Sequence, residues 1–129
     1  MFGVVQGHMS KEIRNLEAVL SQAKHSEISY DWLKAIDAYK EALNIVSECD
    51  LAKIGHIHEQ LGYALHKAAM QAETVDEFRD RMKQALVHYG TAKERYQKIN
   101  GTEKTPLVLR CDAMKAYLAY WLTSEAGEK

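Results

Sequence analysis

The sequence predicts an all-α protein of about five antiparallel helices, and three observations lead to this fold class. Apolar side chains recur at steps of three and four residues over most of the chain, which is the spacing of one helical face. Strand-like alternation is absent, and the only proline is Pro106. The pattern alanine-apolar-x-x-tyrosine-x-x-alanine begins at Ala35 and again at Ala85, an offset of 50 residues. Such repetition is typical of stacked helical hairpins.

The first two helices are predicted on either side of a turn. Apolar residues at helical spacing place the first helix over 13–23, and its end is expected at the polar pair 25–26. The second helix is expected over 32–46, where alanines broaden the apolar stripe into a face that is directed at the core. The acidic segment 48–50 interrupts this pattern and therefore predicts a connection.

The third and fourth helices are predicted on either side of a tight break. Apolar residues keep the step of three and four over 51–72. Thr74 and Glu77 have the spacing of a capping box, which places the start of the next helix directly after Thr74. That fourth helix is expected over 75–99, and the pair 100–101, Asn-Gly, is expected to stop it in the left-handed conformation.

A fifth helix is predicted from Pro106 to Ser124, with Thr105 as its N-cap. It is apolar on more than one side, so one neighbouring helix cannot cover all of its apolar surface. Its candidates for an interface are Tyr117, Tyr120 and Trp121. These aromatic residues are interpreted as core, as a ligand-stacking surface or as an interface, and we predict that they pair two copies of the chain into a homodimer.

Composition and charge indicate one domain. A chain of 129 residues with 47% hydrophobic content can form a single core, which we assign to residues 9–129. Residues 1–8 are interpreted as a cloning remnant, and the chain as a piece of a longer protein. Lys+Arg 17 against Asp+Glu 18 leaves a net charge of -1, without a basic cluster. We therefore expect no nucleic-acid partner.

The sequence predicts a cytoplasmic protein that does not bind a membrane. No apolar run approaches the roughly 20 residues of a membrane span, and no signal segment opens the chain. The two cysteines, Cys49 and Cys111, lack any close pairing, which favours reduced thiols in the cytoplasm over a disulfide framework.

The cluster that is most similar to a metal site is His56-x-His58-Glu59. Residues two apart point to opposite sides of a helix, and Gly62 stands where a di-iron Glu-x-x-His element would need its histidine. We therefore expect no metal, and we expect His58 to be a hydrogen-bonded core histidine. Neither cysteine lies in a glycine-rich elbow, and no glycine-rich loop could hold a phosphate. No catalytic residue, no cofactor and no enzymatic activity are predicted.

Two parts of the chain carry a family resemblance. Leu-Gly-x-x-Leu at 61–65, followed by the tyrosine pattern at Ala85, resembles the paired helices of a tetratricopeptide repeat, and the pattern at Ala35 resembles the second helix of a preceding repeat. The offset of 50 exceeds the roughly 34 residues of that repeat, so the second hairpin is expected to be elongated. The resemblance covers residues 16–99, without the proline that closes a repeat in this family.

In that family the first helix of each hairpin lines a concave groove that binds a peptide. The resemblance therefore implies a noncatalytic adaptor or scaffold that binds a peptide or helix of a partner protein. The paired lysine and asparagine that grip chaperone tails in this family are not recognisable, so such tails are disfavoured. The residues implied to contact the partner are His56, Glu59, Tyr63, His66 and Lys67 of the third helix and Lys24 of the first.

Three other functions remain open. The chain could be a structural module for homo-oligomerisation. The tyrosine pattern also resembles the three-helix microtubule-interacting and trafficking module, which binds short helices but is only about half as long as this chain. A small-molecule sensor would need a polar pocket around His58.

Overall fold

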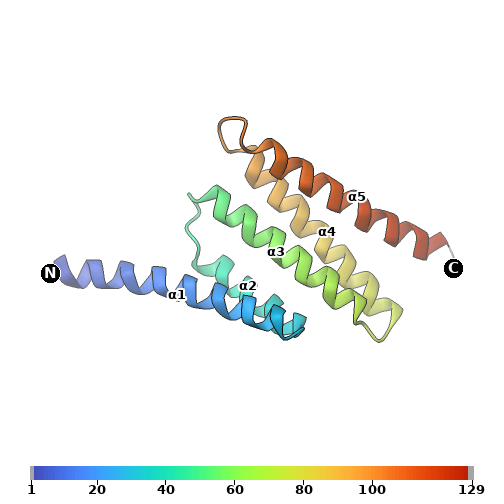
Figure 1. The fold of residues 1–129 in the computed structure, drawn as a ribbon, viewed down its shortest axis with the longest axis horizontal. Helices are drawn as coiled ribbons and strands as arrows, with labels where there is room; N and C mark the ends of the chain where they lie inside the picture. Colours follow the sequence, from blue (N-terminus) through green and yellow to red (C-terminus); the bar gives the residue numbers. More distant parts are fainter. Residues whose placement is uncertain (1, 128–129) are drawn as a thin grey trace.

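The computed structural model describes residues 2–127, and these residues form five α-helices without a β-strand (Figure 1). The helices are α1 (Phe2–Ile28), α2 (Trp32–Ile45), α3 (Leu51–Met70), α4 (Val75–Gln97) and α5 (Thr105–Gly127). The predicted all-α class with about five helices is confirmed. None of these five helices has the length and apolar character that a bilayer span requires.

Each helix packs on the helix that follows it in the sequence. α1 and α2 run in opposite directions on either side of a short turn, as do α3 and α4, and α5 returns along α4 (Figure 1). α3 contacts both α2 and α4, so it joins the two hairpins. This position explains why α3 is buried on more sides than the predicted stripe, with Ile57 and Ala64 buried in addition to Leu61.

The first helix is longer than predicted at both ends. α1 begins at Phe2, within the segment interpreted as a cloning remnant, and continues past the predicted stop to Ile28. It ends in a Schellman arrangement, because the N–H of Tyr30 donates to the Glu27 carbonyl at 3.0 Å and the N–H of Asp31 donates to the Ser26 carbonyl at 2.9 Å. Tyr30 adopts a left-handed φ of 60°, the conformation for which glycine is the usual residue.

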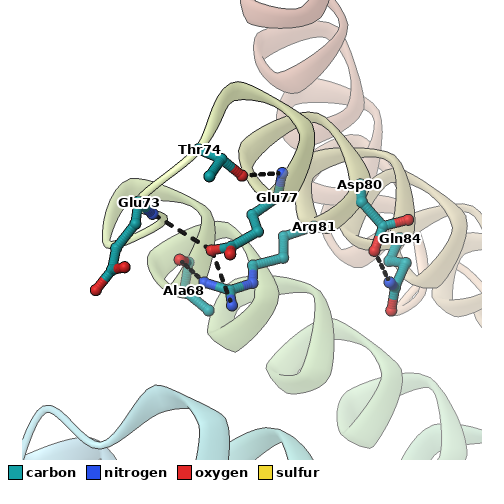
Figure 2. A network of polar contacts seen from close by, with 7 residues as sticks. All are labelled: Ala68, Glu73, Thr74, Glu77, Asp80, Arg81 and Gln84. Carbon is teal, nitrogen blue, oxygen red and sulfur yellow. Dashed lines mark hydrogen bonds and ion pairs between the residues drawn. The ribbon is translucent and has the colours of Figure 1, made fainter.

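The predicted start of α4 is confirmed, with one of the two hydrogen bonds of a capping box. The hydroxyl of Thr74 accepts a hydrogen bond of 3.1 Å from the N–H of Glu77 (Figure 2). The Glu77 carboxylate accepts from the N–H of Glu73 at 3.3 Å, one residue before the position that a standard capping box uses. Arg81 also donates to the Ala68 carbonyl at 2.8 Å and lies 3.6 Å from Glu77, so these side chains tie the ends of α3 and α4 together.

Three other boundaries differ from the prediction by a few residues. α3 ends at Met70 instead of reaching residue 72, and α4 ends at Gln97 before the predicted Asn-Gly stop. Gly101 does adopt a left-handed φ of 95°, but it lies in the loop between α4 and α5. Thr105 is the first residue of α5, not its N-cap, since the N–H of Val108 donates to the carbonyl of Lys104.

The repeated tyrosine pattern forms the contact between helices in both hairpins. The four alanines that begin and end its two copies, Ala35, Ala42, Ala85 and Ala92, are 0% exposed. On α4 the ring of Tyr89 lies against Gly62 of α3, where a Cβ would stand 2.9 Å from the ring. Seven residues later on α4 and seven residues earlier on α3, Tyr96 lies against Gly55 in the same way, at 2.6 Å. Small residues therefore permit the close approach of α3 and α4.

Candidate functional site

Side chains of α1, α3 and α5, with one from α4, line an open groove of about 470 Å³. These helices are far apart in sequence, and α3 supplies more of the lining than either of the others. The lining residues are Lys24, Glu27, His56, Glu59, Gln60, Tyr63, Tyr89, Arg110 and Met114.

Four of the six predicted partner-binding residues line this groove: Lys24, His56, Glu59 and Tyr63. Lys67 does not line it, although its ammonium group lies 5.4 Å from the centroid of the Tyr63 ring at the groove edge. His66 does not line it either, and its side chain is buried. The structure therefore brings most of the predicted set together and turns His66 away.

Glu59 is a buried carboxylate that is fully engaged by neighbouring side chains. It accepts hydrogen bonds from Arg110 Nε at 2.7 Å, from Arg110 Nη2 at 2.6 Å and from the Tyr96 hydroxyl at 2.6 Å. Burial opposes its ionisation, but the bonds from Arg110 and Tyr96 outweigh burial and hold the pKa of this carboxyl below its ordinary value. Glu59 is therefore an anion that orients Arg110, and both of its oxygens already accept hydrogen bonds within the protein.

Arg110 is the residue of this groove that the sequence interpretation missed. Its side chain is 53% exposed while it binds Glu59, and its Nη1 group makes no hydrogen bond to the described part of the chain. The hydrogen bond to Glu59 raises the pKa of the guanidinium, which is permanently charged. The available signal was a single arginine within the otherwise apolar start of the fifth helix.

Lys24 connects α1 to α3 at the other wall of the groove. Its ammonium group donates to Gln60 Oε1 at 3.2 Å and lies 3.5 Å from Glu27. Glu27 in turn accepts a hydrogen bond of 2.6 Å from the hydroxyl of Tyr39 on α2. The carboxylate of Glu27 is thus held between two helices, whereas the Lys24 side chain remains 55% exposed.

His56 adds a ring to the lining of the groove. Burial lowers the pKa of this histidine, and the charges of Lys24 and Arg110 lower it further against the opposing effect of Glu59. His56 is therefore neutral at neutral pH and can both donate and accept a hydrogen bond.

His66 is enclosed between α3 and α5. Its ring meets that of Tyr117 edge to face at a centroid distance of 5.7 Å. Its Nδ1 atom is buried and has no hydrogen-bond partner among the residues that the structure describes. Burial and the nearby Lys67 lower the pKa of His66, so the neutral ring acts as a packing element between the two helices.

His58 is half-buried and pairs with His88 of α4. The two Nδ1 atoms are 3.0 Å apart, and the rings stack at a centroid distance of 5.2 Å. His58 is therefore hydrogen-bonded as predicted, but it is half-buried and not a core residue. His58 also lines a second hollow of about 470 Å³ that is bounded by residues of α2, α3 and α4. Within residues 2–127, no three histidine, cysteine or carboxylate side chains are grouped so that they could hold a metal ion.

The aromatic residues predicted as an interface lie on α5 with different exposures. Tyr117 is 46% exposed and Tyr120 67% exposed, whereas Trp121 is partly buried and packs against the main core. The Trp121 ring lies between the two tyrosines, at centroid distances of 6.4 and 6.5 Å. Leu109, on the same helix, is 61% exposed.

No protein-family model, curated protein or solved structure matches this chain.

Proposed function

We propose that this chain is a noncatalytic scaffold domain that binds a peptide or helix of a partner protein in the groove between α1 and α5, over α3. One observation carries the proposal: four of the side chains implied by the repeat resemblance lie together in one open groove, with Arg110 beside them. A position in the cytoplasm suits this role, because both Cys49 and Cys111 are free thiols.

The composition of the groove suits a protein segment. Protein interfaces combine a central aromatic or apolar contact with a polar rim. Tyr63, which is 40% exposed, and the partly buried Met114 supply the apolar contact. Lys24, Gln60 and Arg110 supply hydrogen-bonding groups at the walls. α3 has 20 residues and is roughly 30 Å long, enough to seat a short helix or an extended peptide.

The helix order supports a tetratricopeptide-like groove. In that family the first helices of successive hairpins line the concave face, and in this proposal α1, α3 and α5 correspond to those helices by their order in the chain. The contact of Tyr89 with Gly62 is consistent with the close helix packing of such repeats. A relative of the microtubule-interacting and trafficking module is the alternative, and it predicts the same class of ligand.

The state of the groove side chains supports a noncatalytic role. A general acid or base works best when its pKa lies near the operating pH. Glu59 is held in its anionic form by Arg110 and Tyr96, and its pKa is lowered, away from neutrality. His56 also has a lowered pKa, and no second carboxylate or thiol of the described groove lining hydrogen bonds to it.

The test is affinity capture from the native lysate with three forms of the chain. Tyr63→Ala removes the exposed ring of the groove, and Val87→Ala removes a side chain on α4 that is 64% exposed but does not line it. We expect wild type and Val87→Ala to retain the same protein partner and Tyr63→Ala to lose it, with all three forms folded at the temperature of the assay. Capture of the same proteins by all three forms would contradict the proposal.

A second candidate function, homodimerisation through α5, is favoured by the exposure of Leu109, Tyr117 and Tyr120. A stable dimer of standard size buries about 800 Å² per partner, so several such side chains must be covered together. Tyr120→Glu tests this candidate better than a change at Trp121, which also packs on the core. Light scattering should give a dimer for wild type and a monomer for Tyr120→Glu, and a monomeric wild type would exclude it.

A further inference from the structure

The charges that line the groove are distributed unequally between solvent and interior. The two cationic side chains, Lys24 and Arg110, are 55% and 53% exposed. The two carboxylates, Glu27 and Glu59, are 14% and 8% exposed. A partner that enters the groove therefore meets positive charge on both walls, although the formal charges of these four residues cancel.

The carboxylates are also occupied by internal hydrogen bonds. Glu59 accepts from Arg110 and Tyr96, and Glu27 accepts from the Tyr39 hydroxyl and from Lys24. These acceptors fix the two cationic side chains in position. Each cation retains N–H groups beyond those bonds, because a guanidinium has five and an ammonium has three.

The same two cations also act on His56, which lines the groove. Three cationic side chains, Lys24, Arg110 and Lys53, lie near enough to disfavour its protonation, and Glu59 is the single carboxylate with the opposite effect among the residues that the structure describes. Burial is the largest cause of the lowered pKa of His56, and these cations add to it, so the ring in the groove lining is neutral.

We infer that the partner segment is acidic, with its side-chain carboxylates on Lys24 and Arg110 and an apolar side chain against Tyr63 and Met114. This inference rests on the proposed function, because it names the chemical class of the segment that the groove binds. Carboxylates suit these residues: a preoriented guanidinium offers a planar pair of N–H groups that matches a carboxylate, and Lys24 offers a point charge on the opposite wall.

The Lys67 ammonium beside the Tyr63 ring extends the cationic surface toward the other end of α3. An acidic residue of the partner that follows its apolar residue in sequence would lie next to Lys67. The favoured segment therefore carries acidic residues on both sides of an apolar one.

The experiment selects peptides from a displayed library of random linear sequences on the immobilised whole chain. Separate selections use wild type, Tyr63→Ala, Lys24→Gln and Lys34→Gln. Lys34 is the matched control, since it is an exposed lysine with an i,i+3 carboxylate partner, Asp31, and does not line the groove. Lys24→Gln keeps a polar group at the wall and leaves the buried Glu59 pair intact, so folding is preserved.

We expect the peptides enriched by wild type to contain more Asp and Glu than the input library and to bind more weakly as salt rises. Synthetic copies should bind Lys24→Gln roughly two- to fivefold more weakly, the range of an exposed ion pair, and should bind Lys34→Gln as they bind wild type.

Four results would overturn the inference. If the enriched peptides show no acidic bias but still fail to bind Tyr63→Ala, the proposed function stands and the inference of an acidic partner is wrong. If no enriched peptide depends on Tyr63 for binding, both the proposed function and the inference of an acidic partner are wrong. If wild type is a dimer that Tyr63→Ala dissociates, the occupant of the groove is a second copy of the chain. If a single-stranded oligonucleotide binds and Lys24→Gln weakens its binding in the same way, the occupant is a nucleic acid.

Discussion

Arg110 of α5 donates two hydrogen bonds, of 2.6 and 2.7 Å, to the buried carboxylate of Glu59 on α3. Tyr96 of α4 donates a third hydrogen bond of 2.6 Å to the same carboxylate. Three helices therefore meet at one anionic group, and the exposed part of Arg110 forms a wall of the groove. The contact that fixes the position of α5 also fixes a side chain that we propose for partner binding.

Arg110→Met should destabilise the fold, because it leaves the Glu59 carboxylate buried with a single hydrogen-bond donor. Loss of one partner of a buried ion pair costs about 3–5 kcal/mol, and the exposure of Arg110 reduces the expected loss to roughly 1–3 kcal/mol. Urea unfolding measures this value. The double variant Glu59→Gln with Arg110→Met should recover part of the loss, since it removes the buried charge. Simple addition of the two single effects would contradict this account of the pair.

Stability should fall as the pH is lowered from neutrality, because of the pair formed by His58 and His88. Burial, then His88 and Arg95, lower the pKa of His58 to about 4, and burial and Lys40 lower that of His88. Both rings are neutral in the folded protein and take up protons on unfolding below the ordinary value of 6.5. The stabilisation is therefore complete above pH 6.5 and is lost as the pH falls toward 4.

Chemical unfolding at about pH 7 and about pH 5 measures this effect, which for one histidine is limited to roughly 1.4 kcal/mol per pKa unit. His58→Gln should reduce the difference in unfolding free energy between the two pH values. His25→Gln, at an exposed position of α1, serves as the control and should leave the difference unchanged. An unchanged difference in His58→Gln would exclude the pair as its source.

Gly62→Ala should destabilise the α3–α4 contact. The new Cβ would stand 2.9 Å from the Tyr89 ring, so that ring and its helix must shift. Overpacking of this kind costs about 1–3 kcal/mol, partly offset by the roughly 1 kcal/mol by which alanine favours a helix over glycine. Gly90→Ala is the matched control, because its Cβ would meet only Lys115 at 3.8 Å. Thermal unfolding should show a lower melting temperature for Gly62→Ala and a higher one for Gly90→Ala.

Tyr30→Gly should stabilise the turn between α1 and α2. A left-handed residue with a Cβ costs about 1–2 kcal/mol, and the Tyr30 side chain is 74% exposed, so its removal loses little packing. Tyr30→Ala keeps the Cβ and should have nearly the stability of wild type. Denaturant unfolding of the three forms distinguishes the cases, and equal effects of glycine and alanine would show that backbone conformation is not the cause.

The features of the fold that could be predicted depend on local patterns. Thr74 and Glu77 predicted the start of α4 because a capping box is contained within four residues. The end of α1 was predicted too early, because a tyrosine, Tyr30, occupies the left-handed position that normally reveals itself as glycine. The few-residue errors at the ends of α3 and α4 have the same origin, since helix ends depend on contacts that a periodic pattern does not contain.

The candidate site was predictable only in part, because it depends on contacts between distant residues. Lys24, His56 and Tyr63 follow from the helical face that the resemblance implies. Glu59 lies on that face, but its burial could not be anticipated, since its partner Arg110 is 51 positions away. The same limit applies to His66, which the position of α5 encloses.

Photocrosslinking in cells expressing the chain tests the central claim most directly. A benzophenone amino acid replaces Tyr63 in the groove or, as the control, Val87 on the exposed side of α4. If the groove binds a partner segment, irradiation should join position 63, and not position 87, to one protein, at an acidic stretch of its sequence that peptide mass spectrometry identifies. Equal crosslinking at both positions, or crosslinking at 63 only to a second copy of this chain, would contradict the claim.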